Sequence, residues 1–192
     1  MPAANIERAI KRGDGTDGSA VQMEELTYEG YGPGGTAILL QALTDNKNRT
    51  VSEVRSTFTK IGGSMAEAGA VAWQFEQKGV VVVNSNEEQV DELTLVAIDA
   101  GADDIETIDT TLHAYSAPSD MEEIRRTLSE SGADIESSEL AMVPKNTIAL
   151  DDKTAMQALR LLDQLEELDD IQKVFSNADF PDEALEEYAN AE

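Results

Sequence analysis

The chain has 192 residues, of which 41% are hydrophobic, and its formal net charge is −25. This length allows a real core in one domain or two small ones, and the complete lack of cysteine excludes disulfides, thiolate nucleophiles and cysteine-ligated metals. No apolar run reaches the length of a membrane span, and the first residues lack a signal-peptide pattern, so we expect a cytoplasmic protein with no membrane contact.

The charge is unevenly distributed along the chain. Residues 1–60 hold seven bases and eight acids, whereas residues 61–192 hold seven bases and 31 acids. Because nucleic acid is a polyanion, the later part should repel it, and any contact should lie in the first third. The acid excess by itself favours solubility, or adaptation to high salt.

The first two predicted strands, residues 24–31 and 36–43, are joined by the glycine-rich sequence GYGPGG. A phosphate-binding loop requires a strand before it and a helix after it. Here the following sequence, TAILLQAL, has strand character, and the Lys-Ser/Thr pair of a Walker loop is absent. Glycine allows positive φ, and Pro33 fixes one turn position. We therefore interpret the loop as a turn between antiparallel strands.

A helix is predicted over residues 51–61, where Thr50 and Glu53 form a capping box before apolar residues at helical spacing. The preceding sequence, TDNKNRT, places basic side chains at the positive end of the helix dipole. A phosphate of RNA or DNA would fit there; the alternative is a solvated loop in which Asn and Asp cap a turn. The basic residues concerned are Lys47, Arg49 and Arg55.

A strand is predicted over residues 70–77, where the alternation would bury Val71, Trp73 and Phe75. Residues 79–146 then contain two similar helix–Gly-Ala-Asp–strand units, with the sequences GADDIE and GADIE. Together with the intervening strand TTLHAYSAP, they predict a β-α-β-β-α-β ferredoxin-like module.

The helix predicted over residues 152–168 and the strand over 172–176 have no partner within that module. The first block of strands needs a second helix to cover its sheet. We therefore predict an α+β fold with two α/β sandwich-type domains, the ferredoxin-like one being inserted into the other. The late helix should pack beside the helix at residues 51–61, and the acidic tail from residue 181 is expected to fray.

Signals for an enzyme are weak. His113 is the only histidine, and a single histidine on a strand is more often structural or exposed than catalytic. The acidic pairs lack the spaced oxygen ligands of a calcium loop and lie where Asp caps helices. No nucleophile–base constellation emerges, so we expect no catalytic residue, no metal and no cofactor. The acidic pairs are Asp103–Asp104, Asp151–Asp152 and Asp169–Asp170.

Several motifs, in order over nearly the whole chain, resemble the YebC/PmpR family. They are MPAANIERAIKRG, YEGYGPGGTAILLQALTDNKNRT, VRSTFTKIGGSM, VAWQFEQKG, ELAMVPKN and LLDQLEELDDIQKVFSNADF. The resemblance implies a cytoplasmic, non-enzymatic factor with a basic helical N-terminal domain and two α/β domains, one inserted in the other. Some family members are described as binding promoter DNA; others act on ribosomes and ease translation of proline-rich stretches.

Two departures from the family pattern matter. The family carries a basic helical domain before the position of Met1, so that domain is missing, truncated or lost to a misassigned start. At Ala70 the family usually has Ser, so a hydroxyl contact would be lost. The expected domains are a helical remnant at 1–21, a discontinuous domain at 22–78 and 147–180, the inserted domain at 79–146, and the tail at 181–192. The nucleic-acid-binding residues carried over are Arg8, Lys11, Arg12, Lys47, Arg49 and Arg55.

The leading functional hypothesis is a DNA-binding transcriptional regulator. The alternatives are a ribosome-associated translation factor, or an acidic interaction module that docks a basic protein while nucleic acid binds only to the missing domain. A monomer is expected.

Overall fold

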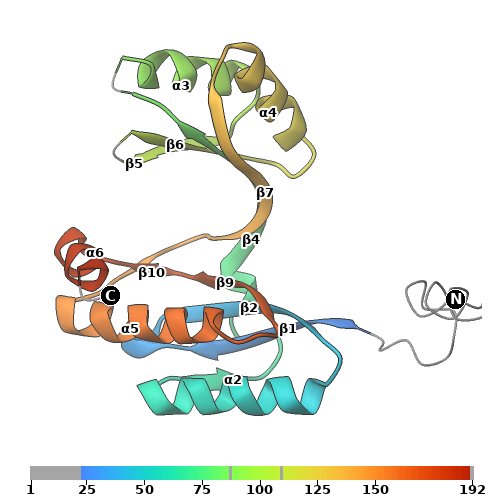
Figure 1. Ribbon diagram of the computed structural model, residues 1–192, viewed down its shortest axis with the longest axis vertical. Helices are drawn as coiled ribbons and strands as arrows, with labels where there is room; N and C mark the ends of the chain where they lie inside the picture. Colours follow the sequence, from blue (N-terminus) through green and yellow to red (C-terminus); the bar gives the residue numbers. More distant parts are fainter. Residues whose placement is uncertain (1–22, 87, 109, 191–192) are drawn as a thin grey trace, which may run out of the picture. The chain divides into compact units, whose positions relative to one another are not determined.

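The protein is described here by a computed structural model, in which the chain forms two compact units (Figure 1). The first unit comprises Met1–Ala72 and Thr147–Glu192, and the second comprises Trp73–Asn146. Both combine helices with an antiparallel sheet, which confirms the predicted α+β class. The structure describes residues 23–86, 88–108 and 110–190, so the helical remnant expected at 1–21 lies outside the described residues.

The first unit is built on a four-stranded antiparallel sheet with the order β3-β1-β2-β9. The strand β3 was not predicted from the sequence, because three residues are too few to establish an alternating pattern. Strand β9 starts one residue earlier than the strand predicted over residues 172–176. The strands are β1 (Glu24–Tyr31), β2 (Ala37–Thr44), β3 (Ser64–Ala66) and β9 (Ile171–Ser176).

The glycine-rich sequence is the turn between β1 and β2. Tyr31 pairs with Ala37 across the antiparallel ladder, and a short 3-10 turn, Pro33–Gly35, joins the two strands. Gly34 and Gly35 have φ of +73° and +76°, a region that residues with a Cβ rarely adopt. The interpretation as a turn is confirmed.

Two helices cover one face of this sheet, α2 (Lys47–Ile61) and α5 (Asp152–Glu166). They contribute buried side chains to one core, so the predicted packing of the late helix beside the early one is confirmed. The core places residues from both ends of the unit's discontinuous sequence in contact. Its buried members are Ile38, Leu40, Ala42, Val54, Phe58, Leu161, Leu165 and Ile171.

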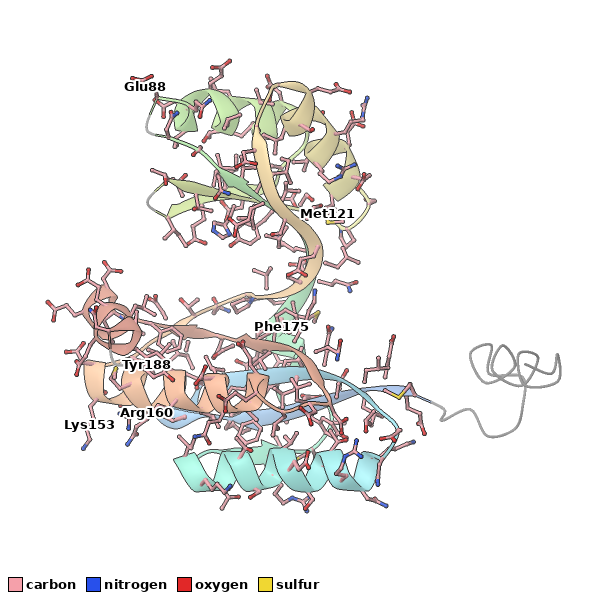
Figure 2. All side chains as sticks on the ribbon, viewed as in Figure 1. Glu88, Met121, Lys153, Arg160, Phe175 and Tyr188 are labelled. Carbon is pink, nitrogen blue, oxygen red and sulfur yellow. The ribbon has the colours of Figure 1, made fainter. Side chains whose placement is uncertain are left out.

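The acidic tail is a helix rather than a frayed end. Helix α6 (Asp182–Ala189) follows a small parallel pair, β8 (Ile148–Ala149) with β10 (Ala178–Asp179). Ala184 is buried against α5, and the hydroxyl of Tyr188, labelled in Figure 2, donates to Asp163 at 3.2 Å. Ala184 and Tyr188 lie one helical turn apart and both contact α5, a spacing that a count of acids does not reveal.

The second unit has the predicted ferredoxin-like order of elements. Its antiparallel sheet has the strand order β5-β6-β4-β7, and both helices contribute to the core on one face. The elements are β4 (Phe75–Asn84), α3 (Val90–Asp99), β5 (Asp104–Ile108), β6 (Thr111–Ser116), α4 (Met121–Glu130) and β7 (Asp134–Pro144).

The strand predicted over residues 70–77 is wrong in its first half. A 3-10 turn, Ala72–Gln74, precedes β4, and Trp73 is 67% exposed rather than buried. The cause is the carboxylate of Glu29, which accepts the backbone N–H groups of Gly69, Val71 and Ala72 at 2.6–2.9 Å. A strand would need those donors for its ladder, so the segment curls around the carboxylate instead. Val71 and Phe75 are buried as predicted.

The buried carboxylate of Glu29, 6% exposed, should stabilise the first unit. Burial alone would raise its pKa, but the three N–H donors outweigh burial, and the pKa lies below its usual value. Glu29→Gln should lower the free energy of unfolding by about 2 kcal/mol, since hydrogen bonds to charged groups contribute about 1.5–3 kcal/mol. Urea denaturation at pH 7, followed by circular dichroism, would measure this.

The control is Glu25→Gln on the same strand, where the side chain is exposed; it should change stability by less than about 0.5 kcal/mol. Equal effects of the two substitutions would contradict a structural role for Glu29.

Candidate nucleic-acid interface

The helix that carries the predicted basic residues begins earlier than the sequence suggested. Asn46 is its N-cap, and its side-chain oxygen accepts the N–H of Arg49 at 3.2 Å. The N–H of Asn46 in turn donates to the hydroxyl of Thr44 at 2.9 Å. The capping box predicted at Thr50 is therefore wrong, and Lys47 lies in the first helical turn instead of a preceding loop.

Arg49 binds a carboxylate that comes from the far end of the chain. Its Nη2 donates to both oxygens of Asp170, at 2.9 and 3.0 Å, and to Asp45 at 2.9 Å. The hydrogen bonds that Arg49 donates to Asp170 and Asp45 raise its pKa, so it stays charged. Half of the side chain remains accessible, at 45% exposure.

Asp170 is a shared acceptor for three side chains. Besides Arg49, the hydroxyls of Thr50 and Thr44 donate to its Oδ2 at 2.7 and 3.1 Å. The residue is 7% exposed. The hydrogen bond from Thr50, together with those from Arg49 and Thr44, holds the pKa of Asp170 below its usual value despite burial. The carboxylate therefore remains ionised at neutral pH.

Lys47 is also paired with an acid, because its Nζ forms an ion pair with Glu24 on β1. Two of the three predicted basic residues on α2 are thus partly neutralised, and Arg49 is held in a network instead of a solvated loop. Their ability to hold a phosphate stays a prediction. Arg55 is exposed on the next turns of α2, and no ion pair forms to it within the described residues.

The outward face of α2 is polar and basic. The helix holds four bases and a single acid, Glu53, in a chain whose net charge is −25. Lys60 was not among the predicted site residues, although its spacing of four residues from the exposed Ser56 could have indicated that it lies on the outward side. The face presents amide, hydroxyl and cationic groups, which are the groups that contact nucleic-acid phosphates. The exposed residues of α2 are Lys47, Asn48, Arg49, Ser52, Glu53, Arg55, Ser56, Thr59 and Lys60, so one carboxylate, that of Glu53, lies among them.

The other residues considered from the sequence lie away from α2 or outside the described residues. The predicted residues Arg8, Lys11 and Arg12 fall within the undescribed first 22 residues. His113 is half-buried on β6, and Asp151 caps α5 by accepting the N–H of Thr154 at 3.1 Å. In the part of the chain that the structure describes, no three acidic or histidine side chains gather as metal ligands. None of the helices described is long and apolar enough to cross a membrane.

A ferredoxin-like unit inserted into a second α+β unit, in a strongly acidic chain, defines a two-domain α+β protein. Residues 23–178 match the family model described as the TACO1/YebC second and third domain, and the chain belongs to this family.

Similar proteins agree with that assignment. A probable transcriptional regulatory protein of Dehalococcoides mccartyi is 55% identical over 189 residues, covering 98% of this chain and 74% of that protein. One from Halothermothrix orenii is 49% identical over 190 residues, covering 97% and 75%. The crystal structure of a conserved hypothetical protein from Aquifex aeolicus has a TM-score of 0.79 and 41% identity, covering 95% of this chain and 75% of that one.

Because of Asp170, the free energy of unfolding should depend on pH in the acid range. The pKa of Asp170 in the folded protein is lowered from the ordinary value of about 3.9, so its stabilisation is fully present above that value and is lost as the pH falls through the folded pKa. Asp170→Asn should lower the free energy of unfolding at pH 7 by about 2 kcal/mol, with the difference from native protein narrowing below about pH 4. Urea denaturation at pH 7 and in acid would measure both.

Asp45→Asn is the matched control, because Asp45 contacts the same arginine but is exposed. It should cost less than about 0.5 kcal/mol. A difference between Asp170→Asn and native protein that stays constant with pH would contradict the ionised state of Asp170.

Proposed function

We propose that the chain is a non-enzymatic regulator of gene expression that contacts DNA through the outward face of α2. The observation that carries this proposal is the charge of that helix: four bases against one acid, in a chain of net charge −25. The names of similar proteins, probable transcriptional regulatory proteins, support a regulatory role.

Such a face suits a phosphate backbone better than base edges. Most protein contacts to nucleic-acid phosphates come from Arg, Lys, Ser, Thr, Asn and backbone N–H groups, and these residue types dominate the exposed side of α2. Contacts of this kind are independent of base sequence and weaken as salt rises. The acids elsewhere repel the polyanion, so electrostatics would orient the protein with α2 toward the phosphates.

Within α2, Arg55 and Lys60 should contribute most to this attraction. Arg49 and Lys47 share their charge with the carboxylates of Asp170 and Glu24, so less of it is available to an external phosphate. Arg8, Lys11 and Arg12 would add positive charge to the same interaction. Even so, we expect weak binding at physiological salt, with a dissociation constant in the non-specific range of about 10⁻⁴ to 10⁻⁶ M.

A second candidate function follows from the acidity of the second unit. Residues 73–146 contain four bases and 17 acids, a net charge of −13. This unit would suit a basic protein partner, such as a protein of the ribosome, while α2 contacts RNA phosphates in place of DNA. A side-by-side titration with duplex DNA, RNA and a basic protein distinguishes the two candidates. A cytoplasmic, monomeric protein without a cofactor remains our expectation.

Reversing the charges of Arg55 and Lys60, which form no ion pair within the described residues, should weaken binding. Arg55→Glu with Lys60→Glu should reduce affinity for a short DNA duplex about tenfold or more at low salt and lower the slope of log K against log salt by about 1.8, because each lost phosphate contact removes about 0.9. The measurement is fluorescence anisotropy across a salt series.

Lys153→Glu with Arg160→Glu is the matched control. These two basic residues lie on the exposed side of α5 (Figure 2), so the change in net charge is the same. Binding should fall less for this pair. An equal fall for both pairs would indicate a general charge effect and would defeat the assignment of the interface to α2.

A further inference from the structure

Trp73 is the only tryptophan of the chain, and it is exposed. At 67% exposure it departs from the usual behaviour of this residue, which is largely buried in folded proteins. Its neighbours are not an apolar patch: Gln74 follows it, and the exposed Glu76 and Gln77 lie in the first residues of β4. The other exposed large apolar residues of the second unit lie on α3, β5 and β7.

The exposure of Trp73 does not come from a loose segment. Its carbonyl oxygen accepts the ammonium Nζ of Lys145 at 2.9 Å, and the carbonyl of Gln74 accepts the N–H of Lys145 at 2.8 Å. Phe75, the first residue of β4, is buried and pairs with Pro144. On the preceding side, the N–H of Ala72 is held by Glu29. The indole is therefore presented by a backbone that is fixed before and after it.

An exposed aromatic residue whose own carbonyl oxygen accepts a hydrogen bond from a cation suits one kind of ligand particularly well. Proteins that bind single-stranded nucleic acid combine aromatic side chains, on which bases stack, with basic groups along the phosphate backbone. Lys145 is exposed, and its ammonium donates a hydrogen bond to the backbone carbonyl oxygen of Trp73. A protein hot spot, by contrast, is normally ringed by contacts that exclude water, and the exposed residues that follow Trp73, Glu76 and Gln77, are polar.

We propose that Trp73 stacks on an unpaired nucleobase while Lys145 contacts the adjoining phosphate. This inference rests on the proposed function as a nucleic-acid-binding regulator, and it specifies a single-stranded segment as the ligand of Trp73 and Lys145. Because residues 73–146 carry a net charge of −13, this contact depends on stacking rather than on long-range attraction of the phosphates. It differs from the role of α2, which requires phosphates alone and does not distinguish paired from unpaired bases. A duplex does not offer the face of an internal base, so the Trp73 site selects unpaired regions.

The single tryptophan makes the test direct. The full chain is titrated with a short single-stranded oligonucleotide, such as a 12-mer of uridine, and with a blunt duplex of the same length. Binding is followed by anisotropy of labelled nucleic acid, and stacking is followed by the intrinsic fluorescence of Trp73. We expect the single strand to quench the tryptophan along the same curve as the anisotropy, with much less quenching by the duplex.

The variants separate stacking from charge. Trp73→Leu should weaken single-strand binding about tenfold, the scale of one lost stacked base, and leave duplex binding unchanged, whereas Trp73→Phe should retain most of the affinity. Lys145→Gln should lower the single-strand salt slope by about 0.7. Leu95→Ala, which removes an exposed apolar side chain from α3, is the control and should change neither ligand's affinity.

The outcomes distinguish this inference from the proposed function. One outcome would overturn the stacking site and leave the α2 interface intact. In it, the single strand binds without changing the tryptophan fluorescence, and Trp73→Leu binds it as tightly as the native protein does. Quenching by a basic protein, but not by the oligonucleotide, would place Trp73 in a protein interface and also overturn the stacking site. A lack of binding to either nucleic acid at low salt would overturn both proposals.

Discussion

The carboxylate of Asp170 holds together the first unit of the protein. It accepts Thr44 at the end of β2 and both Arg49 and Thr50 in the first turns of α2, which lie 120–126 residues away in the chain. The whole second unit lies between these residues in the sequence. Closing so long a loop costs conformational entropy, and the charged, nearly buried contacts at Asp170 offset part of that cost. They also fix where α2 begins relative to β9.

The same contacts determine which cations remain available to a ligand. Acids outnumber bases by 25 in this chain, so an exposed base is an unusual feature rather than a common one. Arg49 and Lys47 are drawn to nearby carboxylates, and Arg49 serves the fold through Asp170. Arg55 and Lys60 face solvent on the opposite side of α2 from the core. Under the proposed function, stability and binding would therefore use different basic residues of one helix.

Trp73 illustrates how a local pattern can mislead. The alternation of residues 70–77 is that of a half-buried strand, yet Glu29 takes the N–H donors that the strand would have used. The resulting turn brings the indole out to solvent. Sequences tend to depart from local rules where a site has other requirements, and an exposed tryptophan on a fixed backbone fits that description.

Sequence alone was enough for the features that depend on neighbouring residues. Alternation and helical periodicity predicted β1, β2 and the ferredoxin-like order of the second unit, and the glycine-rich sequence predicted the turn at Gly34. The α+β class and the packing of α5 beside α2 followed from unmet burial. The start of α2 is set by a local cap, the side chain of Asn46, which the sequence reasoning passed over. Only the tertiary structure decided the partner of Arg49 and the exposure of Trp73. Both depend on a carboxylate brought close by the fold, and no local pattern records which distant acceptor a backbone or side-chain donor will meet.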